Sequence, residues 1–105
     1  MESVFGEINS RSSWTKATVV VVTGGNKGIG FVIVKELAKH GLTVVLTARD
    51  PVKGNAAMEA LKFEEGFENI HFHPLEVTSL TSAQNLAAWL KDEFGGIDIL
   101  VSFQL

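Results

Sequence analysis

The sequence contains no cysteine and no tyrosine, and it has only two prolines in 105 residues. Without cysteine the chain forms no disulfide bond and no thiolate metal site, so we expect a protein of a reducing compartment, the cytoplasm. No apolar run approaches the roughly 18 residues that a membrane-spanning helix needs. These absences exclude a disulfide-stabilised scaffold and predict no membrane partner.

An excess of charge of one sign is also lacking. Charged residues make up 20% of the chain, and the formal net charge is −3. A mildly acidic chain gives no electrostatic reason to bind nucleic acid, so we expect no such partner. The hydrophobic fraction of 46% is ample for a packed core, and the length fits one small domain.

The beginning of the chain differs from the rest. Residues 1–16 have no continuous apolar segment, so we expect a flexible lead-in rather than a secretory signal. The apolar segments all lie in residues 17–105, where we expect a single domain.

From residue 17 onward, short apolar segments alternate with longer helical ones. The first strand is a continuous β-branched run, which is typical of a strand buried on both faces of a parallel sheet. The alternation predicts parallel strands joined by right-handed crossovers. The expected fold class is α/β: the N-terminal half of a doubly wound Rossmann fold, with four parallel strands in the order 3-2-1-4, three helices and an incomplete sheet. Strands are expected at 17–23, 43–47, 70–75 and 97–101, and helices at 28–40, 50–65 and 81–94.

Local signals predict the ends and faces of the helices. Asp50 is expected to cap the second helix, with Pro51 in its first turn, and Thr81 to cap the third in a capping box. The first two helices should cover one face of the sheet, and the third should cover part of the other. We expect residues 31–34 to be largely buried. One face of the third helix should pack inward, through Ala83, Leu86, Ala87, Leu90 and Phe94.

Four glycines lie within seven positions between the first strand and the first helix, in the stretch TGGNKGIG at 23–30. Gly24 and Gly25 are expected to turn the chain sharply with φ values that other residues avoid. Gly28 would let the backbone approach a pyrophosphate, and Gly30 would let the helix pack closely on the strand. The helix N-terminus would present its N–H groups and partial positive charge to the phosphates.

Spacing excludes two other phosphate-binding loops. A P-loop needs Lys and then Ser or Thr after its final glycine, whereas Phe31 and Val32 follow Gly30. The general GxGxxG fingerprint also requires a different spacing. A plain glycine-rich turn without a ligand remains the alternative.

The end of the second strand should select the cofactor. A carboxylate there binds the ribose of NAD, whereas Arg accommodates the 2′-phosphate of NADP. Arg49 stands at this position, and Lys27 adds a second cation nearby, while Asp50 is better explained as the helix cap. We therefore expect NADP (NADPH) as the cofactor, with NAD fitting less well. The alternative is that Arg49 is a solvated surface charge.

A histidine pair raises the question of a metal site. His71 and His73 stand two apart on the third expected strand, with Glu76 close by. An edge strand with half-exposed histidines explains the pair without a metal, and we expect none.

With these residues together, the chain resembles the short-chain dehydrogenase/reductase family. TGGNKGIG at 23–30 is similar to the family's TGxxxGxG cofactor motif. VVLTARD at 44–50 and GGIDILV at 95–101 are similar to its plant carbonyl-reductase-like branch, which includes menthol and salutaridine reductases. The resemblance covers only residues 16–101, the N-terminal portion of such a protein.

The resemblance implies roles for individual residues. Arg49 would meet the 2′-phosphate. The family has Asp-Val after the third strand, with the Asp meeting the adenine amino group, and Glu76 and Val77 stand there in this chain. The pyrophosphate and ribose would be lined by Thr23, Gly24, Asn26, Lys27, Gly28, Ile29 and Gly30.

The chain departs from the family where the family places its catalytic group. The family follows the fourth strand with Asn-Asn-Ala-Gly, whereas residues 102–105 read SFQL here. The family's catalytic Ser and Tyr-x-x-x-Lys have no counterpart in a sequence without tyrosine. We therefore assign no catalytic residue, and we expect residues 17–105 to be a truncated dinucleotide-binding domain that binds NADPH weakly and is inactive alone.

Two hypotheses for the function follow. In the first, the chain is the NADP(H)-binding portion of an oxidoreductase whose complete relatives reduce carbonyl groups by hydride transfer. In the alternative, it is a non-catalytic nucleotide-binding or interaction module. Such a module would pair through the open edge of its sheet with a full-length relative or with itself.

Overall fold

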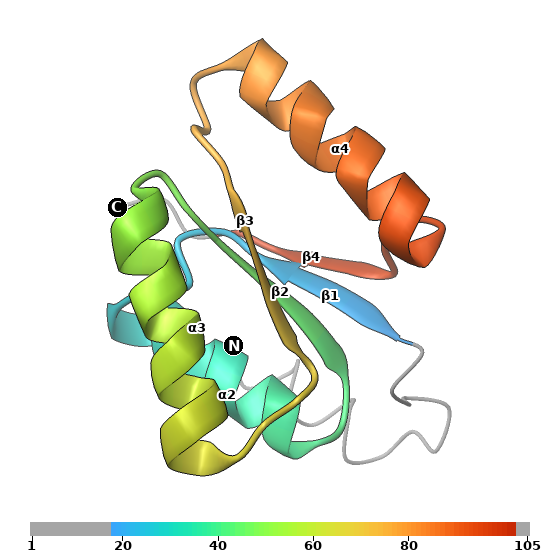
Figure 1. Ribbon diagram of the computed structural model, residues 1–105. Helices are drawn as coiled ribbons and strands as arrows, with labels where there is room; N and C mark the ends of the chain where they lie inside the picture. The colour runs from blue at the N-terminus through green and yellow to red at the C-terminus, as the bar shows by residue number, and fades with distance from the viewer. Residues whose placement is uncertain (1–17, 103–105) are drawn as a thin grey trace.

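A computed structural model describes residues 18–102 of the chain, so the expected lead-in lies outside the described residues. Strands and helices alternate along this part of the chain (Figure 1). The elements are β1 (Val19–Val22), α2 (Gly28–Lys39), β2 (Thr43–Ala48), α3 (Pro51–Glu65), β3 (Ile70–Pro74), α4 (Leu80–Phe94) and β4 (Ile99–Val101).

The four strands form one parallel sheet in the order β3-β2-β1-β4, as the sequence predicts. Every residue of β1 and β2 is buried, because these are the two central strands. In the register, Val20 lies between Val44 of β2 and Ile99 of β4. The predicted fold class and strand order are confirmed.

Helices cover the two faces unequally. Alternate residues of the central strands point to opposite faces, so each strand contributes to two separate cores. On one face, Val20, Val22 and Leu46 pack with α2 and α3, whereas on the other Val21 and Val45 pack with α4. Figure 1 shows α4 across the sheet from α2 and α3, as predicted.

The cap of α4 differs from the prediction. Ser79, rather than Thr81, is the N-cap, and its hydroxyl accepts a hydrogen bond from the Ser82 N–H at 3.2 Å. The backbone of Ser79 is extended, so the chain enters the helix two residues earlier than the capping-box pattern indicates. Thr81 therefore lies in the first turn and does not cap the helix.

Two predictions about buried faces are wrong in part, because each predicted set mixes buried and exposed residues. Val32 is 57% exposed, because only the side of α2 that carries Ile33 and Leu37 meets the sheet. Ala83 and Ala87 are exposed as well. The helix α4 buries a narrow seam made by Leu86 and Leu90, to which Trp89 and Phe94 add partly buried rings.

A carboxylate fixes the start of β4. The Val19 N–H donates to Asp98 Oδ2 at 2.8 Å, and the Asp98 N–H donates to the Val19 carbonyl at 2.9 Å. The two bonds join the first residue of β1 to the residue before β4. The strand is therefore two residues shorter than predicted and begins at Ile99.

Aromatic rings attach α4 to the edge strand β3. The ring centroids of His71 and Phe94 lie 5.2 Å apart, and those of His73 and Trp89 lie 4.9 Å apart. Trp89 also contacts Phe94 edge to face. Burial lowers the pKa of His71 below its ordinary value, and the positive charge of Lys62 lowers it further, against an opposing effect of Glu93. The folded state therefore favours the neutral imidazole of His71 over its protonated form.

We expect the chain to lose stability as the pH falls below about 6.5, the ordinary pKa of histidine. The unfolded chain takes up a proton on His71 at a higher pH than the folded chain does. The contribution of this group is therefore complete above the unfolded pKa and is lost as the pH falls through the folded pKa. Urea unfolding at several pH values measures the slope of the free energy of unfolding against pH. A His71→Phe variant keeps an aromatic ring beside Phe94 and should show a smaller slope, and an unchanged slope would contradict the assignment.

Candidate functional site

The glycine-rich turn connects β1 to α2. Gly24 and Gly28 have φ values of +66° and +62°, the left-handed region that favours glycine. A Cβ atom built on either residue meets nothing within 4 Å, so the main chain at both positions faces open space. A ligand can therefore approach these two peptide units directly.

The other two glycines of the turn are needed for packing. Gly25 does not have a positive φ, so the prediction that φ explains it is wrong. A Cβ there would lie 2.9 Å from Cγ2 of Val34. A Cβ on Gly30 would lie 2.5 Å from the carbonyl oxygen of Gly24. The close packing expected at Gly30 is present, although its partner is the turn rather than the strand.

The N-terminus of α2 lacks a side-chain cap. Lys27 is its N-cap residue and makes no capping hydrogen bond, and the first turn contains no acidic residue. Within the described residues the missing side-chain cap sets α2 apart, because Asp50 and Ser79 cap α3 and α4 with their side chains. The first-turn N–H groups and the helix dipole of α2 are thus available to an anion.

A cleft of about 330 Å³ lies where β1, β2 and β3 end. In parallel α/β sheets, ligands bind outside the carboxyl ends of the strands, which is where this cleft lies. It brings together residues from the glycine turn, the end of β2, the start of α3 and the loop after β3. The lining residues are Thr23, Gly24, Asn26, Lys27, Thr47, Ala48, Arg49, Asp50, Lys53, Leu75, Glu76 and Val77.

Most residues that the sequence predicts to bind the cofactor line this cleft. The exceptions are Gly28, Ile29 and Gly30, which form the start of α2 beside it. Ile29 is largely exposed, and Gly30 is buried against the turn. The structure therefore divides the predicted set into residues that border the cleft and residues that shape the helix start.

Thr23 links the glycine turn to the last strand. Its N–H donates to the Val101 carbonyl at 2.9 Å, and its Oγ1 lies 3.2 Å from the Ser102 hydroxyl oxygen. The position of the turn therefore depends on β4 as well as on β1.

The role expected for Asp50 is present. Its Oδ1 accepts hydrogen bonds from the Val52 N–H at 2.9 Å and the Lys53 N–H at 3.4 Å, at the start of α3. Its carboxylate is thus used as a helix cap.

Lys53 is a cleft residue that sequence reasoning missed. It lies in the first turn of α3, where the positive end of the helix dipole disfavours a cation. That unfavourable placement, only four residues after Arg49, was a signal that could have identified it. Three cations therefore line the cleft: Lys27 in the glycine turn, and Arg49 and Lys53 near the end of β2.

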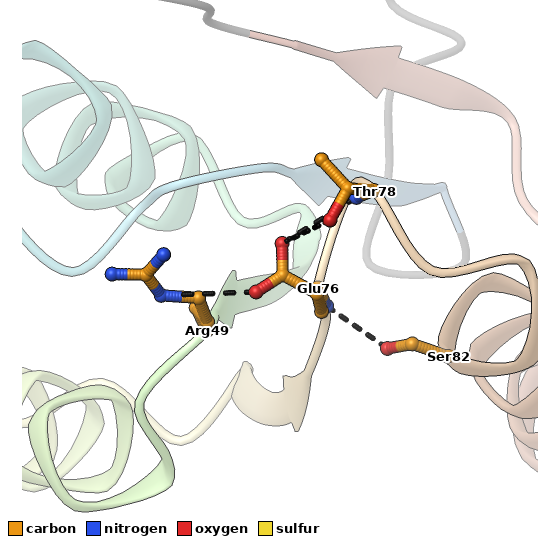
Figure 2. A network of polar contacts seen from close by, with 4 residues as sticks. All are labelled: Arg49, Glu76, Thr78 and Ser82. Atoms are coloured by element: carbon orange, nitrogen blue, oxygen red, sulfur yellow. Dashed lines mark hydrogen bonds and ion pairs between the residues drawn. The ribbon is translucent and has the colours of Figure 1, made fainter.

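Glu76, in the loop after β3, lines the cleft and makes polar contacts with three other residues (Figure 2). Its Oε2 lies 3.8 Å from Nε of Arg49, and its Oε1 accepts hydrogen bonds from the Thr78 hydroxyl at 3.0 Å and the Thr78 N–H at 3.4 Å. The Glu76 N–H donates to the Ser82 hydroxyl oxygen at 2.9 Å. Arg49 is exposed, but it is paired with a carboxylate rather than surrounded by solvent alone.

The described residues contain no group of three His, Cys, Asp or Glu side chains that could hold a metal ion. The rings of His71 and His73 pack on α4 instead. None of the helices described between residues 18 and 102 has the length and apolar character to cross a membrane.

Comparison with known proteins adds independent findings. A family profile described as short chain dehydrogenase matches residues 18–102. Salutaridine reductase of Papaver somniferum is 51% identical over 89 residues, which cover 84% of this chain and 28% of that protein. The Bos taurus protein named carbonyl reductase (NADPH) 1 is 46% identical over 85 residues, which cover 80% of this chain and 30% of that protein.

The fold is also that of solved relatives. The structure of menthone neomenthol reductase from Mentha piperita matches with a TM-score of 0.79 at 41% identity, over 83% of this chain and 31% of that chain. The present chain therefore spans less than a third of the length of these relatives.

Proposed function

This chain belongs to the short-chain dehydrogenase family, and from that premise we propose that its described residues bind the dinucleotide NADP(H). The site would be the NADP(H)-binding portion of a carbonyl-reducing oxidoreductase. The observation that carries the proposal is that one cleft is lined both by Gly24 of the open glycine turn and by the cations Arg49 and Lys53.

The glycine turn suits the pyrophosphate. Gly24 and Gly28 expose their peptide units, and the α2 N-terminus has no side-chain cap. A bound phosphate would accept hydrogen bonds from the first-turn N–H groups, and the helix dipole would stabilise its charge. No side chain is needed for this contact.

The two cations suit a phosphate on the adenosine ribose. Arg49 and Lys53 line the cleft beyond the end of β2, where a cofactor bound at the turn would place its adenosine end. The guanidinium of Arg can grip a phosphate through two parallel hydrogen bonds. Support comes from a relative that is named for NADPH.

We assign no catalytic residue in this chain. The family resemblance gives the proton donor of carbonyl reduction to a tyrosine, and the 105 residues contain none. The role we propose for residues 18–102 is to bind and orient the dinucleotide, whose nicotinamide supplies the hydride when it is bound.

Titration with NADPH and NADH tests the proposal. We expect the unmodified chain to bind NADPH more tightly than NADH. Arg49→Ala should weaken NADPH about tenfold or more and leave NADH nearly unchanged, because hydrogen bonds to charged groups contribute roughly 1.5–3 kcal/mol. Nucleotide fluorescence measures both affinities.

Lys91→Ala is the matched control, because Lys91 is an exposed cation on α4 that does not line the cleft. It should change neither affinity. Binding of NADH as tightly as NADPH by the unmodified chain would overturn the proposal.

A further inference from the structure

We propose that Glu76 is a positioning residue that sets the preference for a 2′-phosphorylated dinucleotide by holding Arg49, and that it does not act as an adenine-binding group. This inference rests on the proposed function of the cleft. It concerns how the selectivity arises rather than whether a dinucleotide binds.

The sheet register brings the two residues together. Arg49 directly follows β2, and Glu76 lies two residues beyond the end of β3. The last residues of these neighbouring parallel strands, Ala48 and Pro74, are register partners, and the Leu75 N–H continues the ladder to the Ala48 carbonyl at 2.9 Å. The side chains at 49 and 76 therefore leave the same edge of the sheet.

Glu76 is held in place before it meets Arg49. Its N–H donates to the Ser82 hydroxyl, its carbonyl accepts from the Ser79 N–H at 2.9 Å, and its Oε1 accepts from Thr78. Ser79 and Ser82 themselves belong to the capped start of α4. Glu76 is thus held by hydrogen bonds both at its main chain and at one of its carboxylate oxygens.

The two carboxylate oxygens have different partners. Figure 2 shows that Thr78 binds one oxygen, Oε1, and that the other, Oε2, faces Nε of Arg49. The distance from Oε2 to Nε is 3.8 Å. The Arg49 side chain is 82% exposed, whereas that of Glu76 is 37% exposed. The carboxylate is therefore the anchored member of the pair, and the arginine is the member that it restrains.

The contact leaves the phosphate-binding part of Arg49 unused. A guanidinium has one N–H on Nε and four on its two terminal nitrogens, and the carboxylate faces Nε. Both terminal nitrogens remain for a phosphate. Holding a long exposed side chain in one orientation before binding removes part of the conformational entropy that binding would otherwise cost.

The length of the Glu76 side chain matters for this role. The family pattern has Asp at this position, and Asp is shorter by one methylene group. The shorter carboxylate would fall further from Nε, which Glu76 itself approaches only to 3.8 Å. Glu76 is therefore suited to reach across to the neighbouring strand end.

Four variants test the inference by titration with both dinucleotides. Glu76→Gln and Glu76→Asp should each weaken NADPH about two- to fivefold and leave NADH within about twofold, the range that exposed ion pairs give. Thr78→Val, which removes the hydroxyl bound to Oε1, should weaken NADPH in the same direction but less. In an Arg49→Ala background, Glu76→Gln should have no further effect on NADPH, because Arg49 is the residue through which it acts.

The outcomes separate this inference from the proposed function. If the unmodified chain binds neither dinucleotide, the proposed function fails. If it binds NADPH and Glu76→Gln weakens NADPH and NADH equally, Glu76 contacts the shared adenosine and the inference is overturned. If Glu76→Gln tightens NADPH, or if its effect persists without Arg49, the inference is overturned as well. Circular dichroism of each variant reports whether it folds.

Discussion

Gly30→Ala is expected to destabilise the chain by roughly 1–3 kcal/mol, the usual cost of overpacking, and to reduce NADPH binding at least about tenfold. The added Cβ would lie 2.5 Å from the Gly24 carbonyl oxygen and 3.1 Å from Cα of Gly25. All of these neighbours are main-chain atoms of the turn, so no rotamer change relieves the clash. Either α2 shifts away or the turn opens, and both remove the anion-binding geometry.

Urea unfolding and NADPH titration measure the two effects. Val32→Ala is the control, because Val32 lies on the exposed side of the same helix and outside the cleft. It should alter neither stability nor affinity appreciably. A Gly30→Ala chain with normal stability and normal affinity would refute the close packing of α2 on the turn.

Asn69→Leu should lower the free energy of unfolding by roughly 1–3 kcal/mol, the cost of leaving a buried polar group unpaired. Asn69 is only 9% exposed, and its Nδ2 donates to the carbonyls of Ala38, in the last turn of α2, and Leu42, directly before β2. The Ala38 carbonyl keeps a second partner in the Gly41 N–H, so the Leu42 carbonyl carries most of the loss. Leucine has the same branched shape and number of heavy atoms but donates nothing.

Asn55→Leu is the matched control for this variant. Asn55 also donates from Nδ2 to a carbonyl, that of Pro51, but it is exposed on α3, where water can replace the bond. Its effect should stay within about 0.5 kcal/mol, as for most surface substitutions. Equal losses of stability from the two variants, measured by urea unfolding, would show that burial is not the cause.

The order of elements could be predicted because its signals are local. Continuous apolar strands, the Asp50 cap with Pro51 behind it, and glycine stops all act over a few residues. Gly66 and Gly95, for example, end α3 and α4 in the left-handed conformation. Alternation of such elements then restricts the topology to a parallel sheet.

The errors lie where distant contacts decide. Gly25 is explained by Val34 of the following helix, and the exposure of Val32 depends on how α2 rests on the sheet. Whether Ser79 or Thr81 caps α4 depends on where the loop after β3 enters the helix. No pattern within a few residues contains this information.

The candidate site was predicted in outline and missed in detail for the same reason. The glycine turn and Arg49 stand in recognisable positions next to strands, and both lie at the cleft. Lys53 joins them because α3 turns its first residues toward the cleft. The Arg49–Glu76 pair exists only because β2 and β3 are neighbours that end level with one another.

The bond between Val19 and Asp98 constrains the order in which the chain can fold during synthesis. The two residues are 79 positions apart, whereas β1 pairs with β2 through Val19 and Thr43. A ribosome that has released β2 and β3 has already supplied one partner for β1, but the opposite edge of β1 stays unpaired until Asp98 and β4 are released. Closing so long a loop is entropically costly, and closure of this edge is therefore a late event in folding.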